Sequence, residues 1–160
     1  MVNLFDAEHQ VFLDILNKHN VEYLLIGGMA VNIHGYSRGT GDLDIWISSS
    51  QENKERMIKA ISDFGYDTTE YEKMKPDEIT MFSLGSRKIP GYIEITNRIA
   101  GIQFDDSYKR VQKLVVEGIS VSYIHFDDLI RNKLASARPR DLDDVENLKR
   151  IKRSQEKEKE

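Results

Sequence analysis

Two aspartates, Asp42 and Asp44, are the residues of this 160-residue chain whose type and spacing most directly indicate chemistry. They alternate with apolar residues in the run 42–47, so in a strand both carboxylates would project from one face. At about 6 Å and an effective dielectric near 20, their repulsion would be roughly 3 kcal/mol. A divalent cation between them would turn that repulsion into binding energy. The simpler alternative is a strand end facing solvent, where both charges are hydrated.

A glycine pair, Gly27-Gly28, stands between an apolar run and a short helical pattern. Glycines at such a junction let the backbone approach a phosphate closely. The pair is no Walker loop, because no Gly-Lys-Ser/Thr follows, and no dinucleotide fingerprint, because the third glycine is missing. Taken alone, it is equally typical of a tight turn between a strand and a helix.

The elements that must position these residues are predicted from periodicity and from turn residues. Strands are predicted at 22–26, 42–47, 79–84, 92–96, 113–117 and 119–124. Helices are predicted at 6–20, 29–34, 51–64, 126–137 and 139–153. Helices at both ends flank a strand-rich centre. The expected fold class is therefore α/β or α+β: a mixed central sheet with helices packed on it, and helices at the C-terminal end.

Together, the glycine pair and the carboxylate pair resemble the signature of the nucleotidyltransferase superfamily, which has the DNA polymerase β-like fold. That signature is Gly-Gly or Gly-Ser followed, a short distance on, by Asp-x-Asp in an apolar strand. Here thirteen residues separate Gly28 from Asp42. Arg38-x-Thr40 is similar to the Arg-x-Thr/Ser that precedes the carboxylates in small bacterial branches. Those branches include abortive-infection type toxins and lincosamide-modifying enzymes.

The resemblance implies roles for residues along the first two thirds of the chain. The family takes a third carboxylate from a neighbouring strand, and the alternation over 92–96 makes Glu94 the candidate. Asp42, Asp44 and Glu94 would then be the catalytic, metal-binding carboxylates for two Mg²⁺ ions. The nucleotide-binding residues would include Gly27, Gly28, Arg38 and Thr40. The alternative for Glu94 is an edge-strand carboxylate in water.

A second resemblance lies in the segment 128–144, which is similar to the Lys-Leu-x-Ala…Arg-x-x-Asp-Leu-x-Asp helices of the same branches. It implies that Lys133 contacts the nucleotide phosphates as a catalytic residue and that Asp141 supports the site. A structural alternative exists, because Pro139 suits the first turn of a helix. Acids just after it would complement the positive end of that helix without any catalytic duty.

Other chemistry-bearing residues form weaker patterns. The four histidines have no zinc-type spacing. His9 and His19 lie near the two ends of the first helix, beside its apolar stripe, where partial burial is expected. His34 is expected to pack against a loop rather than reach a nucleotide. Trp46 would share the face of the two aspartates, either lining the site or lying in the core. The following basic residues could border an acceptor groove or be ordinary solvated charges: Arg87, Lys88, Arg98, Lys109, Arg110 and Lys113.

Composition narrows the class of protein. With no cysteine, disulfide scaffolds and thiol catalysis are excluded, and the net charge of −4 argues against nonspecific coating of nucleic acid. No apolar run approaches a membrane span and no signal peptide is recognised at the N-terminus, so a cytoplasmic location without membrane contact is expected. We expect a single domain over 1–153 and a charged, frayed tail at 154–160.

The expected function is that of a Mg²⁺-dependent nucleotidyltransferase, which moves a nucleoside monophosphate from an NTP to a hydroxyl acceptor by in-line attack at the α-phosphorus. The acceptor would be tRNA, a protein or a small molecule, and a toxin of a toxin–antitoxin pair is one version. A second copy or a partner protein would complete the acceptor pocket of so short a chain. Two alternatives stay open: a module of the same fold that binds nucleotide without transferring it, and a metal-dependent phosphohydrolase that uses water as acceptor.

Overall fold

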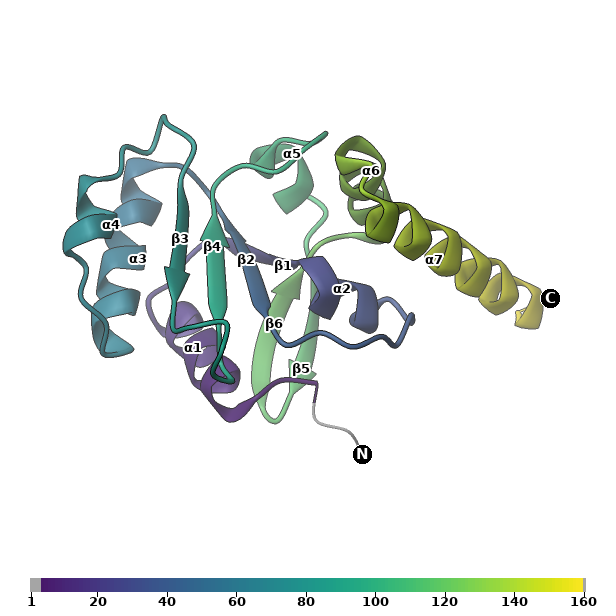
Figure 1. Cartoon of the computed structure of the whole chain (residues 1–160), viewed down its shortest axis with the longest axis horizontal. Coiled ribbons are helices and arrows are strands. Elements are labelled where there is room, and N and C mark those ends of the chain that lie inside the picture. Colours follow the sequence, from purple (N-terminus) through teal and green to yellow (C-terminus); the bar gives the residue numbers. More distant parts are fainter. Residues whose placement is uncertain (1–3, 160) are drawn as a thin grey trace.

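The computed structural model of the protein describes residues 4–159. Residues 1–3, part of the segment in which no signal peptide is recognised, and residue 160, the end of the expected tail, lie outside the described residues. Within the described part, helices and strands alternate along the chain much as predicted (Figure 1).

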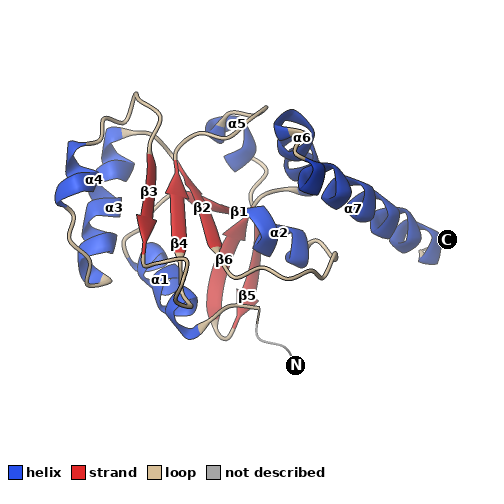
Figure 2. Ribbon diagram, viewed as in Figure 1, coloured by secondary structure: helices blue, strands red, loops and turns tan. Residues whose placement is uncertain are grey.

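The centre of the fold is a six-stranded sheet (Figure 2). Its strands are β1 (Tyr23–Ile26), β2 (Leu43–Ile47), β3 (Met81–Leu84), β4 (Ile93–Thr96), β5 (Gln112–Val116) and β6 (Ile119–Tyr123). They lie in the order β3-β4-β2-β1-β6-β5. The pairs β1–β6 and β2–β4 are parallel and the other pairs are antiparallel. The sheet is therefore mixed, which confirms the predicted fold class.

Helices cover both faces of the sheet (Figure 1). They are α1 (Ala7–Lys18), α2 (Gly27–Ile33), α3 (Gln51–Asp63), α4 (Thr69–Lys73), α5 (Phe104–Tyr108), α6 (Phe126–Ser136) and α7 (Pro139–Glu158). One apolar cluster joins the sheet to α1, α3 and α4, and a second joins it to α2, α5, α6 and α7. Strand β1 is buried at every position because both of its faces are covered. Between residues 4 and 159, no helix combines the length and apolarity that a bilayer crossing needs.

Some element boundaries differ from the prediction. The last helix does not end at Arg153: it continues to Glu158, because the residues that follow contain strong helix formers and neither glycine nor proline. Residues 154–158 of the expected tail are thus helical. Helix α2 begins at Gly27 itself, two residues earlier than predicted. The short helices α4 and α5 are absent from the prediction, since five residues are too few to establish a helical period.

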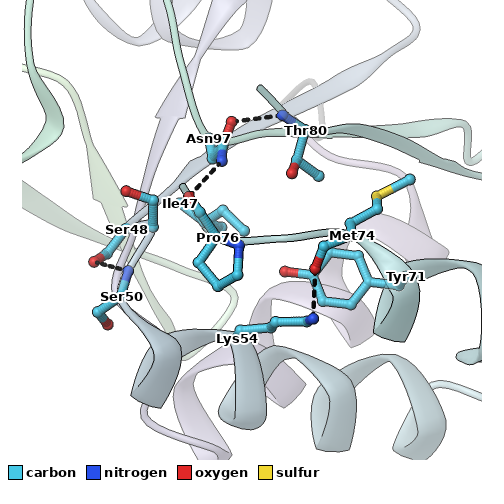
Figure 3. Close-up of a pocket in the computed structure, with 10 residues that line it drawn as sticks. Ile47, Ser48, Ser50, Lys54, Tyr71, Met74, Pro76, Thr80 and Asn97 are labelled. Atoms are coloured by element: carbon cyan, nitrogen blue, oxygen red, sulfur yellow. Dashed lines mark hydrogen bonds between the residues drawn. The ribbon is translucent and has the colours of Figure 1, made fainter. Parts of the chain in front are cut away.

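A small pocket beside the ends of β2 and α3 shows how this end of the sheet is closed (Figure 3). Its volume of about 20 Å³ is that of roughly one water molecule, too little for a substrate. The ammonium group of Lys54 donates to the carbonyls of Glu72 and Met74, at 2.7 and 2.5 Å. The amide oxygen of Asn97 accepts from the Thr80 backbone N–H at 2.8 Å. These bonds hold the segment between α4 and β3 in place.

Asn53 joins α3 to the sheet next to this pocket. Its fully buried side chain donates to the carbonyls of Glu22 and Ser48, at 3.1 and 3.0 Å, and accepts from the Glu22 N–H at 2.8 Å. Ser50 caps the same helix by accepting from the Asn53 N–H. One amide side chain thereby satisfies three backbone groups at the outer ends of β1 and β2.

We expect Asn53→Ala to lower the free energy of unfolding by about 3 kcal/mol, because three backbone groups lose their partner. Ser50→Ala removes only the cap and should cost about 1 kcal/mol. Chemical denaturation of both variants and the wild type measures the difference. A cost of Asn53→Ala no larger than that of Ser50→Ala would contradict this role.

Candidate active site

A cavity of about 510 Å³ lies between the sheet and the α6–α7 pair. It is bordered by the junction of β1 and α2, the loop before β2, the strands β2 and β4, and the N-terminal end of α7. All nine residues nominated from the sequence line it: Gly27, Gly28, Arg38, Thr40, Asp42, Asp44, Glu94, Lys133 and Asp141. The structure thus brings together residues from positions 27 to 141.

The carboxylates meet on the central strands. Asp44 pairs in register with Glu94 on the parallel strand β4 and with Ile26 at the end of β1, and Asp42 directly precedes β2. Burial is the largest cause that raises the pKa of Asp44, and the charges of Glu94 and Asp42 add to it; together, against a smaller opposing effect of Arg87 and Lys133, they bring the pKa to about 6. Ionising all three acids together is therefore costly.

The glycine pair lets neighbouring side chains press against the backbone. Gly27 has a positive φ of 69°, and a Cβ there would overlap the carboxylate of Asp44. A Cβ on Gly28 would stand 2.6 Å from the hydroxyl oxygen of Thr40 and 3.2 Å from the guanidinium of Arg38. The cavity floor is assembled around these two positions, and any larger residue would displace a side chain that lines it.

A chain of ion pairs, buried except at Arg138, forms the wall opposite the sheet. Arg38 donates two hydrogen bonds to Asp144, at 2.8 and 3.0 Å. The ammonium of Lys133 lies 2.9 Å from the same carboxylate and 3.3 Å from that of Asp141, which also accepts from Arg138 at 2.7 Å. Burial alone would raise the pKa of Asp141, but hydrogen bonds from Arg138 and the charge of Lys133 outweigh it and lower the pKa.

Asp144 is the residue that sequence reasoning missed. It is fully buried, and it holds both cations that the resemblance implies for phosphate contact. From the sequence it belongs to a group of acids near the start of a helix, which the helix dipole explains equally well. Its signal is the spacing Asp141-x-x-Asp144, which places both carboxylates on one face of α7.

The cavity gathers positive charge in a chain whose net charge is −4. Its six basic residues are Arg38, Arg87, Arg98, Lys133, Arg138 and Arg140, against four acids: Asp42, Asp44, Glu94 and Asp141. Of the basic residues suggested for an acceptor groove, only Arg87 and Arg98 line it, and Arg110 instead pairs with the buried Asp128. Such an excess of arginine and lysine favours an anionic ligand.

The aromatic and histidine residues have structural positions. Trp46 shares the face of Asp44 but is buried against Phe104 and does not line this cavity. His34 bonds to the Ile124 carbonyl at 2.7 Å. The same ring packs edge-on against Tyr123 and Phe126, where β6 leads into α6. His9 is fully buried and bonds to the Tyr92 carbonyl, which is deeper than the partial burial expected, while His19 pairs with Asp63.

The donor chemistry of Asp42, Asp44 and Glu94 fits a hard divalent cation such as Mg²⁺, which prefers carboxylate oxygens. The raised pKa of Asp44 marks negative charge that a cation would stabilise. As the side chains lie, no three acidic or histidine residues in the described range 4–159 are grouped closely enough to hold a metal ion. Glu94 is instead engaged by Arg87 at 3.1 Å. The three carboxylates therefore fit the ion by type and line one cavity, but their side chains must turn toward one another before they can hold it.

Asp44→Asn should stabilise the metal-free protein at pH 7.5 by about 2 kcal/mol. Because the folded-state pKa is raised, protonation of Asp44 favours the folded state, so the penalty of its charge is complete above about pH 6 and vanishes as the pH falls toward 4. Denaturation in EDTA at pH 7.5 and pH 4 measures the two differences. Asp106→Asn, at an exposed position on α5, is the control, and an equal gain from Asp44→Asn at both pH values would contradict the assignment.

Asp144→Asn should lower the free energy of unfolding by about 3 kcal/mol, because Arg38 and Lys133 lose the buried charge that they share. Asp143→Asn is a matched control, since this neighbour is exposed and its carboxylate accepts a long hydrogen bond of 3.4 Å from the Tyr36 hydroxyl. It should change stability by less than about 0.5 kcal/mol. Urea titrations of the two variants decide the point, and similar costs would show that Asp144 has no special structural role.

Solved structures share this fold. The lincosamide antibiotic adenylyltransferase LnuA, in its lincomycin-bound form, superposes with a TM-score of 0.56 at 18% identity, covering 92% of this chain and 98% of its own. An antigenic nucleotidyltransferase-like protein from Paracoccidioides brasiliensis superposes with a TM-score of 0.50 at 13% identity, covering 90% of this chain and 77% of its own. No curated protein sequence matches the chain significantly.

At identities of 18% and 13%, the structural similarity shows the fold alone. Family membership is shown by the sequence itself, because residues 3–155 match the family described as "Nucleotidyltransferase of unknown function (DUF6036)". That match includes every residue nominated for the site and all the strands of the sheet. The chain therefore belongs to the nucleotidyltransferase family DUF6036.

Proposed function

We propose that the protein transfers a nucleoside monophosphate from an NTP to a hydroxyl acceptor and that it depends on Mg²⁺. One observation carries the proposal: the nine residues nominated from sequence motifs line a single cavity of about 510 Å³. A cavity of this size is within the range of small-ligand sites. Membership of a nucleotidyltransferase family and the fold shared with an adenylyltransferase support the same reaction class.

The cationic side would bind the triphosphate. Arg38 and Lys133 are held by Asp144 and line the cavity, so their charges are positioned before a ligand arrives. Gly27 and Gly28 line the same cavity, so their backbone would face the phosphates of the bound nucleotide. Thr40 would orient a phosphate oxygen or Asp42, and Asp141 would keep Lys133 in place.

The acidic side would hold the metal. Asp42, Asp44 and Glu94 would be the ligands of two Mg²⁺ ions, which when bound would lower the pKa of the acceptor hydroxyl and neutralise the triphosphate. The acceptor hydroxyl would lose its proton to solvent and its oxygen would form a bond to the α-phosphorus, while the bond from that phosphorus to the bridging oxygen breaks and pyrophosphate leaves. Arg38 and Lys133 would stabilise the charge that develops on the leaving pyrophosphate.

The acceptor is proposed from the same three classes as before: tRNA, a protein or a small molecule. The lincomycin-bound state of LnuA, which matches almost its full length to this chain, favours the small molecule. A tRNA acceptor would give a steep dependence of affinity on salt, and a small neutral acceptor almost none. A cytoplasmic location and a second copy or partner protein at the acceptor pocket stay predictions.

Calorimetry with Mg²⁺ and each of the four NTPs tests the site. We expect one NTP to bind in the presence of Mg²⁺ and its affinity to fall at least about tenfold in Asp42→Asn/Asp44→Asn, because the metal loses two charged ligands. Asp14→Asn/Asp106→Asn removes the same charge at exposed positions outside the cavity and should bind like the wild type.

Labelled NTP then separates the candidate activities. Label on an acceptor indicates transfer, free phosphate or nucleoside monophosphate indicates hydrolysis, and binding without turnover indicates a nucleotide-binding module. NTP binding that persists in Asp42→Asn/Asp44→Asn would refute the metal site. A fold lost in that variant, seen by circular dichroism, would make the aspartates structural residues.

A further inference from the structure

Arg87 lies in the loop between β3 and β4 and lines the cavity that also contains the three carboxylates. The loop is bounded by Gly85 and Gly91, whose φ angles of 87° and 97° lie in the left-handed region that favours glycine. Residues 85–90 are all exposed. An arginine in such a loop can change its partner without disturbing the strands on either side.

The guanidinium of Arg87 is nevertheless directed onto the sheet. It donates to a carboxylate oxygen of Glu94 at 3.1 Å, and it lies 5.1 Å from the centre of the Tyr92 ring. Tyr92 is itself fixed, since its hydroxyl bonds to that of Ser83 at 2.8 Å. The Arg87 side chain stays 69% exposed, against 22% for Glu94.

Glu94 is thereby set apart from the other two acids. Within residues 4–159, no ion pair of Asp42 or Asp44 is seen, while Glu94 already has a cation at hydrogen-bond distance. A divalent ion bound by all three must compete with the guanidinium for the oxygens of Glu94. Because ion pairs with an exposed partner are weak, that competition can be won.

We propose that Arg87 exchanges partners at this site: it pairs with Glu94 when the cavity is empty and contacts a phosphate of the substrate when the metal is bound. The guanidinium suits both partners, because its planar donors match carboxylate and phosphate oxygens alike. Its loop already borders the cavity, so the exchange needs a side-chain rotation rather than a domain movement. This inference rests on the proposed function for the metal and the phosphate, but its consequence is particular to Arg87.

The exchange predicts opposite effects of one substitution. In Arg87→Gln, Glu94 is released, so Mn²⁺ alone should bind about threefold to fivefold more tightly. The same variant loses a charged phosphate donor, so inorganic triphosphate in saturating Mn²⁺ should bind about tenfold more weakly. Electron paramagnetic resonance of free Mn²⁺ and calorimetry with triphosphate measure the two affinities without any turnover.

Lys88→Gln is the matched control, because it removes the same charge from the next residue of the loop, which does not line the cavity. If the affinities for Mn²⁺ and triphosphate change equally in the two variants, Arg87 acts only through its long-range charge and the exchange is overturned. So would Arg87→Gln changing both affinities in the same direction, or leaving either unchanged. If the wild type binds neither Mn²⁺ nor triphosphate, the proposed function fails as well, whereas wild-type binding with the wrong pattern in Arg87→Gln refutes Arg87 alone.

Discussion

The carboxylate of Asp144 is the point on which the cavity depends. It lies fully buried in α7, accepts hydrogen bonds from Arg38 of the loop before β2, and forms an ion pair with Lys133 of α6. A buried carboxylate without partners would cost several kcal/mol, so these three side chains stabilise one another only as a set. Because they come from three separate elements, the set ties the helical pair to the loop before β2. The apolar cluster packs the same helices on the sheet, and the ion pairs fix where the charged side chains of the cavity wall lie.

The two sides of this cavity differ in how far their charges are paired. On the helical side the cations are paired, and Lys133 has two carboxylates within 3.3 Å. On the sheet side Asp42, Asp44 and Glu94 lie together with a single exposed arginine on one of them, and the pKa of Asp44 rises to about 6. A fold selected for stability alone would not place acids in register on central strands, where aspartate is a poor strand former. Strain of this kind collects at sites that bind a ligand.

The sequence predicted the parts of the site that follow from local pattern. Alternation in 42–47 placed Asp42 and Asp44 on one face, and it placed Trp46 on that face as well, although packing against Phe104 buries the indole. The strand of Glu94 was also predicted locally. Its pairing with Asp44 came only from a family resemblance, because register between β2 and β4 depends on contacts across 50 residues.

What could not be predicted depends on contacts between distant segments. Arg38 and Asp144 are 106 positions apart in the sequence, and the residues around each give no sign that the two side chains pair. The salt bridge of Arg87 could not be read from the run of exposed residues around it, and α4 and α5 are too short to show a period. Tertiary context decides each of these features.

At the glycine pair, close packing of the cavity wall and binding of a phosphate both require a backbone without a Cβ. Gly27 and Gly28 leave room for Asp44, Thr40 and Arg38 against the backbone, so any side chain there would push lining groups out of place. The same lack of a Cβ is what a phosphate would need to approach the backbone. A glycine required only for a turn would be needed at one position, for its positive φ, and Gly27 meets that description. Gly28 has no such angle. Its constraint is the contact with Thr40 and Arg38, so the second glycine is explained by the assembly of the cavity rather than by the turn.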